Sequence, residues 1–294
     1  MNQWRSIADL AGAEDAKIAL IGAPLSKGSV TVGACDRGPA TIRAAMKRIS
    51  TYDLETGLDL SARFFDYGDV DVASMMPAEA FAPLRTAFSK AISSHDFSII
   101  LGGNNAITRA GVHALETGLA QTGLITFDAH FDMRDTSAGL TNGNPVQALI
   151  DDGMPGANIA QIGLAPFANA KYMHDVALRE GNRLYTLSEC RARGIADVVT
   201  SALDELSKRC AAIYVDFDID VIERGMAPGA PGARPGGLST DDFFVAARMI
   251  ARHPKVKAVD VAEFDPALDL SDISALIAAR WVAETFAGLA QREG

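Results

Sequence analysis

Short apolar runs recur along the chain, and glycine, proline or acidic residues end most of them. Stretches with helical spacing follow many of these runs. The runs predict strands at residues 17–24, 63–69, 97–101, 123–127, 158–163, 183–187, 211–220 and 257–263. Helices are expected from Gly38-Pro39 onward, over 78–93, from about Ala106, and over 273–289. Strands that alternate with helices predict an α/β fold, a three-layer α/β/α sandwich around a mostly parallel sheet.

Two of the predicted strands end in side chains that bind metals. Asp128, His130 and Asp132 directly follow the run 123–127. The run 211–220 ends in Asp-x-Asp-x-Asp, and alternation along a strand would place its three acids on one face. Like charges at such spacing destabilise one another unless a positive ion lies among them. We therefore expect the two strand ends to share one or two divalent cations.

The remaining polar features also follow the carboxyl ends of predicted strands. Gly102-Gly103 ends one strand, Glu263 ends the last, and the Gly/Pro-rich segment 228–237 comes directly after the acidic run. In parallel sheets, ligands bind beyond these ends, so the features predict one shared site. Because no linker, low-complexity tract or internal repeat is evident, residues 1–294 are predicted to form a single domain, with 228–237 as an active-site loop.

Composition narrows the classes of partner. The 294 residues carry a formal net charge of −10, which argues against nucleic acid or an anionic membrane as the main partner and leaves a small molecule. Cys35, Cys190 and Cys210 show no CxxC spacing and are expected to be buried in a protein of the reducing cytoplasm. Residues 1–6 lack the layout of a signal peptide, and no unbroken apolar run reaches the roughly 18 residues of a membrane span.

Several motifs, in this order along the chain, resemble the ureohydrolase superfamily, which includes arginase, agmatinase, guanidinobutyrase and formimidoylglutamase. They are Gly38-Pro39, Gly102-Gly103, Asp128-Ala129-His130-Phe131-Asp132, Asp218-Ile219-Asp220 with Ala227-Pro228-Gly229, and Glu263-Phe264-Asp265-Pro266. The resemblance implies an arginase-like fold, two Mn²⁺ ions per chain, and hydrolysis of a C–N bond in a guanidino or amidine group. By the same analogy the chain would form a homotrimer or homohexamer.

The resemblance also implies a role for each motif residue. Asp128 and Asp218 would bind both ions, Asp132 the first, and His130 and Asp220 the second. Two such ions can activate water near neutral pH. Asp132 could then relay a proton to the leaving nitrogen, and Glu263 would hold the cationic group of the substrate. Asp216 stands where relatives usually carry serine, so it is expected behind the ligands rather than among them.

Two positions depart from the family pattern. Asn105 replaces the histidine that binds the first metal, and it is either a weaker ligand or a spectator. The segment Asn142-Gly143-Asn144-Pro145 lacks the histidine that serves arginases and agmatinases as a proton shuttle. Formimidoylglutamases resemble the chain more here, and they often carry an arginine such as Arg134 after the metal motif. Asn142, Asn144, Arg134 and Glu263 are the expected substrate-binding residues.

These features favour a formimidoylglutamase, an enzyme of histidine metabolism that converts N-formimino-L-glutamate and water into L-glutamate and formamide. Arg134 would pair with a substrate carboxylate, which agmatine lacks; a structural salt bridge with the adjacent Asp135 is the alternative. An agmatinase or guanidinobutyrase activity is the second hypothesis. A catalytically silent paralogue is the third, because Asn105 and Asn142 weaken the family's catalytic set.

Overall fold

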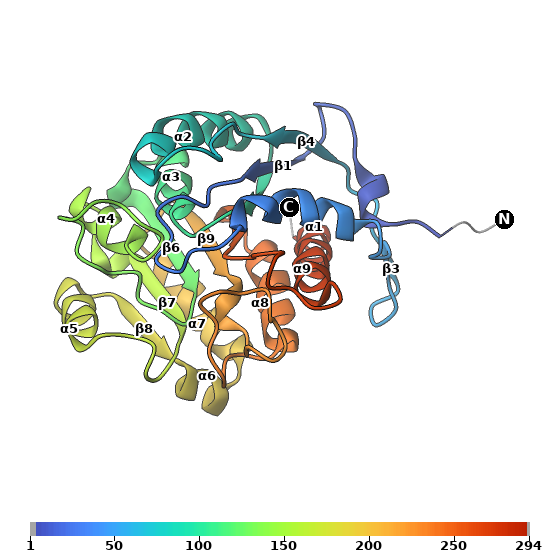
Figure 1. The fold of residues 1–294 in the computed structure, drawn as a ribbon. Coiled ribbons are helices and arrows are strands. Elements are labelled where there is room, and N and C mark those ends of the chain that lie inside the picture. The colour runs from blue at the N-terminus through green and yellow to red at the C-terminus, as the bar shows by residue number, and fades with distance from the viewer. Residues whose placement is uncertain (1–3, 293–294) are drawn as a thin grey trace.

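A computed structural model describes residues 4–292, and a single eight-stranded sheet runs through its centre (Figure 1). The strand order is β4-β1-β5-β10-β9-β6-β7-β8, and every neighbouring pair is parallel. The strands are β1 Ile18–Ala23, β4 Phe64–Asp69, β5 Phe97–Gly102, β6 Thr122–Phe127, β7 Ile159–Leu164, β8 Arg183–Thr186, β9 Ala212–Asp218 and β10 Val256–Ala262. A separate small hairpin pairs β2 Tyr52–Asp53 with β3 Leu58–Asp59.

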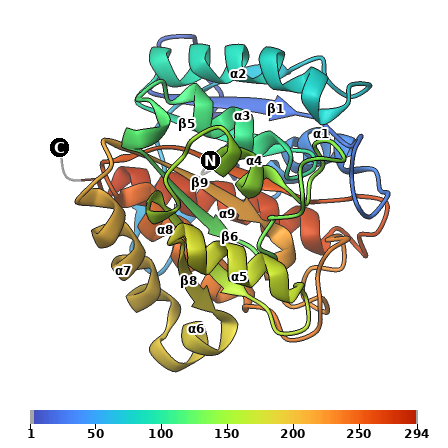
Figure 2. The same ribbon diagram turned by 90° about the vertical axis from the view of Figure 1, so that its left-hand side faces the viewer.

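Helices cover both faces of the sheet, which confirms the predicted three-layer α/β/α fold (Figure 2). One layer holds α2 Pro77–Ser94, α3 Ile107–Ala114, α4 Pro145–Asp151 and α5 Lys171–Glu180. The other holds α1 Gly38–Met46, α6 Leu187–Arg193, α7 Ile195–Ser207, α8 Thr240–Arg252 and α9 Ile273–Ala290. The expected strands and helices are present with boundary shifts of a few residues.

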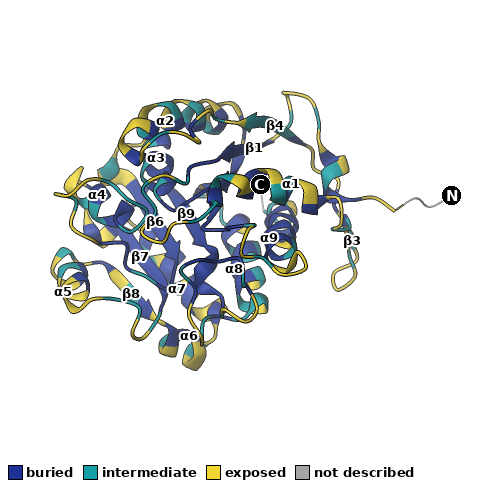
Figure 3. Cartoon of the chain, in the orientation of Figure 1, coloured by how far each residue is buried: buried dark blue, intermediate teal, exposed yellow. Residues whose placement is uncertain are grey.

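The central strands are buried on both sides because each apolar side chain faces one of two cores (Figure 3). Along β5, Ile99 and Leu101 join the core under α1 and α9, whereas Ile100 joins the core under α2 and α3. Along β9, Val215 and Tyr214 divide in the same way. This division explains why these strands appear in the sequence as continuous apolar runs rather than as alternating ones.

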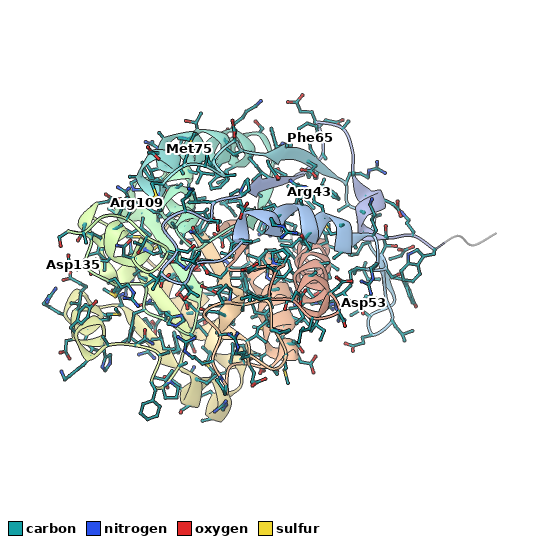
Figure 4. All side chains as sticks on the ribbon, viewed as in Figure 1. Arg43, Asp53, Phe65, Met75, Arg109 and Asp135 are labelled. Carbon is teal, nitrogen blue, oxygen red and sulfur yellow. The ribbon has the colours of Figure 1, made fainter. Side chains whose placement is uncertain are left out.

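Helix α9 forms most of one core. By length and composition it could cross a membrane, with a mean hydropathy of 1.3, yet 72% of the segment is buried inside the protein. Its Glu284 is nearly buried and pairs with Arg280 and with Arg248 of α8. Arg248 also pairs with Asp53 of the β2–β3 hairpin, which is labelled in Figure 4. The segment is thus the core helix of a globular fold.

One sequence expectation about the acidic strand is wrong. Strand β9 ends at Asp218, and Asp220 lies in a short 3₁₀ helix, Ile219–Val221. The side chain of Asp218 accepts a hydrogen bond from the Asp220 backbone N–H at 2.8 Å, which turns the chain out of the strand. The three acids therefore do not share one face of a strand, although Asp218 and Asp220 still reach the same site. The three cysteines are buried and free, as expected.

Candidate metal centre and substrate pocket

The candidate site lies where four neighbouring strands end. In sheet order these are β5, β10, β9 and β6, and they carry Asn105, Glu263, Asp218 and Asp128 at or just beyond their carboxyl ends. All four side chains are at least 95% buried. Residues far apart in sequence therefore meet at one edge of the sheet, as parallel topology requires.

Asp128, His130 and Asp220 form the tightest group of potential ligands. His130 Nδ1 lies 3.0 Å from Asp220 Oδ2 and 3.3 Å from Asp128 Oδ1. One ligand atom from each residue falls within 4.8 Å of the others. Asp128 Oδ1 also accepts the His130 backbone N–H at 2.6 Å, so the turn after β6 is held by one of the acids that it presents.

Asp132 and Glu263 complete the site from strained backbone positions. Their φ angles are 51° and 61°, in the left-handed region that residues other than glycine rarely adopt. Asp132 Oδ2 accepts a hydrogen bond from Asn105 Nδ2 at 2.6 Å. Glu263 Oε1 accepts one from the Asn105 backbone N–H at 2.7 Å and one from Asn142 Nδ2 at 2.8 Å. Strained residues that their surroundings hold in place in this way concentrate at functional sites.

The carboxyl groups of the site are buried close together, which makes their ionised forms unfavourable without a cation. Burial raises the pKa of Asp128 to about 7. Burial also raises the pKa of Glu263 to about 7, although the hydrogen bonds that Glu263 accepts from Asn142 and Asn105 act to lower it. Burial and neighbouring acids also raise the pKa values of Asp132 and Asp218 well above their ordinary range. Burial alone would lower the pKa of His130, but Asp220 and Asp128 raise it to about 12. One imidazolium thus faces several buried carboxyls, and added positive charge would favour their ionised forms.

The donor set fits divalent manganese. Carboxylate oxygens and one imidazole are hard or borderline donors of the kind that Mn²⁺ accepts. The backbone of loop 228–237 closes over these donors, since a Cβ atom on Gly232 would collide with Asp220 Oδ2 and lie 3.2 Å from His130 Cε1. Asn169 fixes the segment that carries three of the donors, because it accepts from the Phe131 backbone N–H at 2.8 Å and donates to the Ala129 carbonyl at 2.9 Å.

A pocket of about 90 Å³ opens above the acids. Arg134 and Asn142 line it beside Asp132 and Glu263. Arg134 is exposed, and within residues 4–292 the structure gives its side chain no salt bridge. The adjacent Asp135 instead accepts hydrogen bonds from Ser137 at the surface of the molecule (Figure 4). The structure therefore favours a free guanidinium at the pocket over the alternative of an Arg134–Asp135 pair.

Two of the expected site residues lie beneath the pocket rather than on it. Asn144 is buried, and its amide is used within its own loop, where it accepts from the Thr141 backbone N–H and donates to the Gly139 carbonyl. Asn105 faces the ligand group but lies below the pocket wall, and Thr108 Oγ1 donates to its Oδ1 at 3.0 Å.

Asp216 lies behind the ligands on β9, fully buried and in register with Asp260 of β10. Tyr214 donates a 2.5 Å hydrogen bond to Asp260, and burial raises the pKa values of Asp216 and Asp260. This placement agrees with the expectation that Asp216 supports the site without being a ligand.

The fold and the site together define a class of protein: an α/β protein with a candidate divalent-cation site formed by acids at the carboxyl ends of its strands. The model of the arginase family matches residues 16–288. The chain is 32% identical to formimidoylglutamase of Bacillus subtilis (strain 168) over 276 residues, which cover 92% of this chain and 86% of the relative. The crystal structure of formimidoylglutamase from that species superposes with a TM-score of 0.93 at 30% identity, covering 100% of this chain and 95% of the other.

Formiminoglutamase of Trypanosoma cruzi with Mn²⁺ shares the fold, with a TM-score of 0.89, 24% identity and coverage of 99% and 100%. The chain belongs to the arginase family.

Sequence reasoning located the motifs of this family but did not single out Arg234, which also lines the pocket. Arg234 belongs to loop 228–237, which the sequence predicts as part of the site, so an arginine in that loop is the signal that could have identified it.

Proposed function

We propose that the chain is a manganese-dependent formimidoylglutamase, which hydrolyses N-formimino-L-glutamate to L-glutamate and formamide. The observation that carries this proposal is one pocket with buried acids at its base and the exposed guanidinium of Arg134 on its wall. Such a pocket matches a substrate with a cationic amidine at one end and a carboxylate at the other. The curated relatives at 32% and 31% identity are formimidoylglutamases, which supports the same choice.

The metal ligands are the residues that the sequence motifs suggested. Asp128 and Asp218 would bind both Mn²⁺ ions, Asp132 and Asn105 the first, and His130 and Asp220 the second. The close grouping of Asp128, His130 and Asp220 supports the second site. Asn105 lies beside the first site, because its Nδ2 donates to Asp132. To bind the ion, its Oδ1 would have to turn away from the Thr108 hydroxyl that now donates to it. When bound, the ions supply the Lewis acidity that activates water at neutral pH.

The protein's own side chains bind and orient the substrate. Glu263 accepts both of its hydrogen bonds on Oε1, so that Oε2 is the oxygen available to hold the cationic formimino group. Asp132 takes a proton from the attacking water and passes it to the leaving nitrogen as the C–N bond breaks. Asn142 lines the pocket and fixes Glu263, and its own Oδ1 is fixed by the Val30 backbone N–H at 2.7 Å. Asn144 shapes the loop from below.

A substrate panel tests the proposal. The Mn²⁺-loaded protein should release formamide from N-formimino-L-glutamate and little or no urea from arginine, agmatine or guanidinobutyrate. Arg134→Ala should raise KM for the diacid about tenfold or more, because a charge-assisted hydrogen bond is lost. Urea from agmatine or guanidinobutyrate would favour the guanidino hydrolase instead. Absence of every product, together with no bound Mn²⁺, would favour the silent paralogue.

Cellular context belongs to the same proposal. We place the enzyme in the cytoplasm, in histidine breakdown, and as a homotrimer or homohexamer, by analogy with the family. Light scattering of the purified protein at several concentrations gives the assembly directly. A stable monomer would contradict that part of the proposal without affecting the chemistry.

A further inference from the structure

A second arginine lines the same pocket. Arg234, from loop 228–237 after β9, lies with Arg134, from the segment after β6, around the opening above the acids. Both side chains are exposed. We infer that Arg234 and Arg134 each bind one of the two carboxylates of a dicarboxylic substrate, so that together they select an N-formimino diacid. This inference rests on the proposed function and adds to it the residue that recognises the second carboxylate.

Loop 228–237 is built to hold Arg234 close to the metal ligands. Gly232 packs directly against Asp220 and His130, where any side chain would collide. Arg224 supports the loop from within, because its Nη1 donates to the carbonyls of Ala230, Pro231 and Ala233 at 3.2, 3.4 and 3.2 Å. Arg234 follows two residues after Gly232, and its Nη1 donates to the Gly232 carbonyl at 2.5 Å. That bond uses one terminal nitrogen and leaves the rest of the guanidinium for a ligand.

Arg134 is positioned independently by another loop. Its backbone N–H donates to the Gly143 carbonyl at 3.0 Å. A Cβ on Gly143 would lie 2.8 Å from Arg134 Cδ and 2.9 Å from its Nε, so the arginine side chain lies against that glycine. The neighbouring Asn142 holds Glu263, the residue proposed to bind the amidine. The two guanidinium groups thus enter one pocket from separate, separately supported loops.

Charge matching decides among the possible substrates. N-formimino-L-glutamate carries one amidinium, for the acidic base of the pocket, and two carboxylates, for two arginines. Guanidinobutyrate has one carboxylate and leaves one arginine unpaired. Agmatine brings a second cation toward both arginines. Two planar guanidinium groups, each able to pair with a carboxylate through two hydrogen bonds, therefore favour the diacid and disfavour the alternatives.

Three substrates and four variants test the assignment. The substrates are N-formimino-L-glutamate, N-formimino-L-glutamine, which lacks the side-chain charge, and N-formimino-4-aminobutyrate, which lacks the α-carboxylate. Arg234→Ala should raise KM for the diacid about tenfold to a hundredfold with little change in kcat. Arg234→Ala should have little effect on KM for whichever of the two analogues lacks the carboxylate that Arg234 binds. Arg134→Ala should spare the other analogue, and Arg234→Lys should restore part of the loss.

Arg85→Ala is the matched control, since Arg85 is an exposed arginine on α2 outside the pocket. It should leave all three KM values unchanged. An Arg234→Ala variant with the wild-type KM for the diacid, or with equal losses on all three substrates, would overturn the inference, because equal losses indicate a disturbed loop rather than a lost carboxylate contact.

Direct binding separates this inference from the proposed function. L-glutamate should bind the Mn²⁺-loaded wild-type protein in calorimetry, and Arg234→Ala should weaken that binding about tenfold or more. A wild-type protein that hydrolyses none of the three substrates would overturn the proposed function. In that case the glutamate measurement alone decides the dicarboxylate site: weaker binding in Arg234→Ala supports it, and unchanged binding overturns it.

Discussion

Manganese should raise the thermal stability of this protein in two separable steps. Asp128, Asp132 and Asp218 are buried acids whose pKa values burial raises, and His130 is the histidine that faces them. A bound cation relieves the repulsion among their ionised forms in the folded state only, because the unfolded chain does not bring them together. Binding free energy at the site therefore becomes folding free energy.

The expected size follows from linkage. At a free Mn²⁺ concentration one hundred times the dissociation constant, one filled site adds about 2.7 kcal/mol to the free energy of unfolding. For 294 residues, the entropy of unfolding near 60 °C is about 0.6 kcal/mol per kelvin. One filled site should therefore raise Tm by about 4 °C, and two by about 9 °C.

Scanning calorimetry of chelator-treated protein, titrated with Mn²⁺, measures the shift, and elemental analysis counts the bound ions. Asp220→Ala removes a ligand assigned to the second ion alone, so it should leave one Mn²⁺ per chain and about half of the shift relative to its own metal-free Tm. Asp175→Ala is the control, since Asp175 is an exposed acid on α5 that pairs with Lys171. The reasoning fails if Mn²⁺ leaves the wild-type Tm unchanged, or if Asp220→Ala keeps two ions and the full shift.

Three further changes have defined outcomes. Asn105→His should tighten Mn²⁺ binding on the order of tenfold in calorimetric titration, since imidazole is a better donor than an amide; equal affinity would place Asn105 outside the ligand set. Tyr214→Phe should lower the free energy of unfolding by about 1.5–3 kcal/mol in urea, because Asp260 loses its hydroxyl donor; a cost below about 0.5 kcal/mol would contradict this. Burial, Arg292 and Lys255 lower the pKa of His253 in the folded state, so the protein should lose stability as pH falls below about 6.5, and His253→Gln should reduce that loss; a parallel pH profile in the variant would exclude it.

The fold could be predicted from the sequence because its central strands are buried on both faces, and such strands appear in a sequence as short apolar runs. Residues 97–101 and 123–127 are mostly apolar, with Ser98 and Thr126 as buried exceptions, and each run is followed by polar residues at the carboxyl edge of a parallel sheet. That edge is where the topology brings Asn105, Asp128, Asp218 and Glu263 together. The apolar runs and the polar residues that follow them are visible in the sequence, so the order of the motifs and their positions at strand ends were enough to locate the candidate site.

Loop paths are not encoded in the same way. Asp220 leaves the strand because an acid two residues earlier captures its N–H, which the alternating Asp-x-Asp-x-Asp pattern hides. Arg234 reaches the pocket because Gly232 allows the backbone to touch Asp220, a contact that no local periodicity encodes. Asn144 resembles a ligand-binding residue in its motif, yet it is consumed by its own turn. In each case a few local hydrogen bonds or one close approach decide where the side chain lies.

The two asparagines that depart from the family pattern belong to one network. The Asn105 backbone N–H and the Asn142 side chain both donate to Glu263 Oε1, and the Asn105 side chain donates to Asp132. Asp132 and Glu263 are the two site residues with positive φ, so these bonds hold the most strained parts of the pocket. A decayed site would have no reason to retain such strain, which costs of the order of 1–3 kcal/mol per residue. The departures therefore agree better with a site specialised for a different substrate than with a silent one.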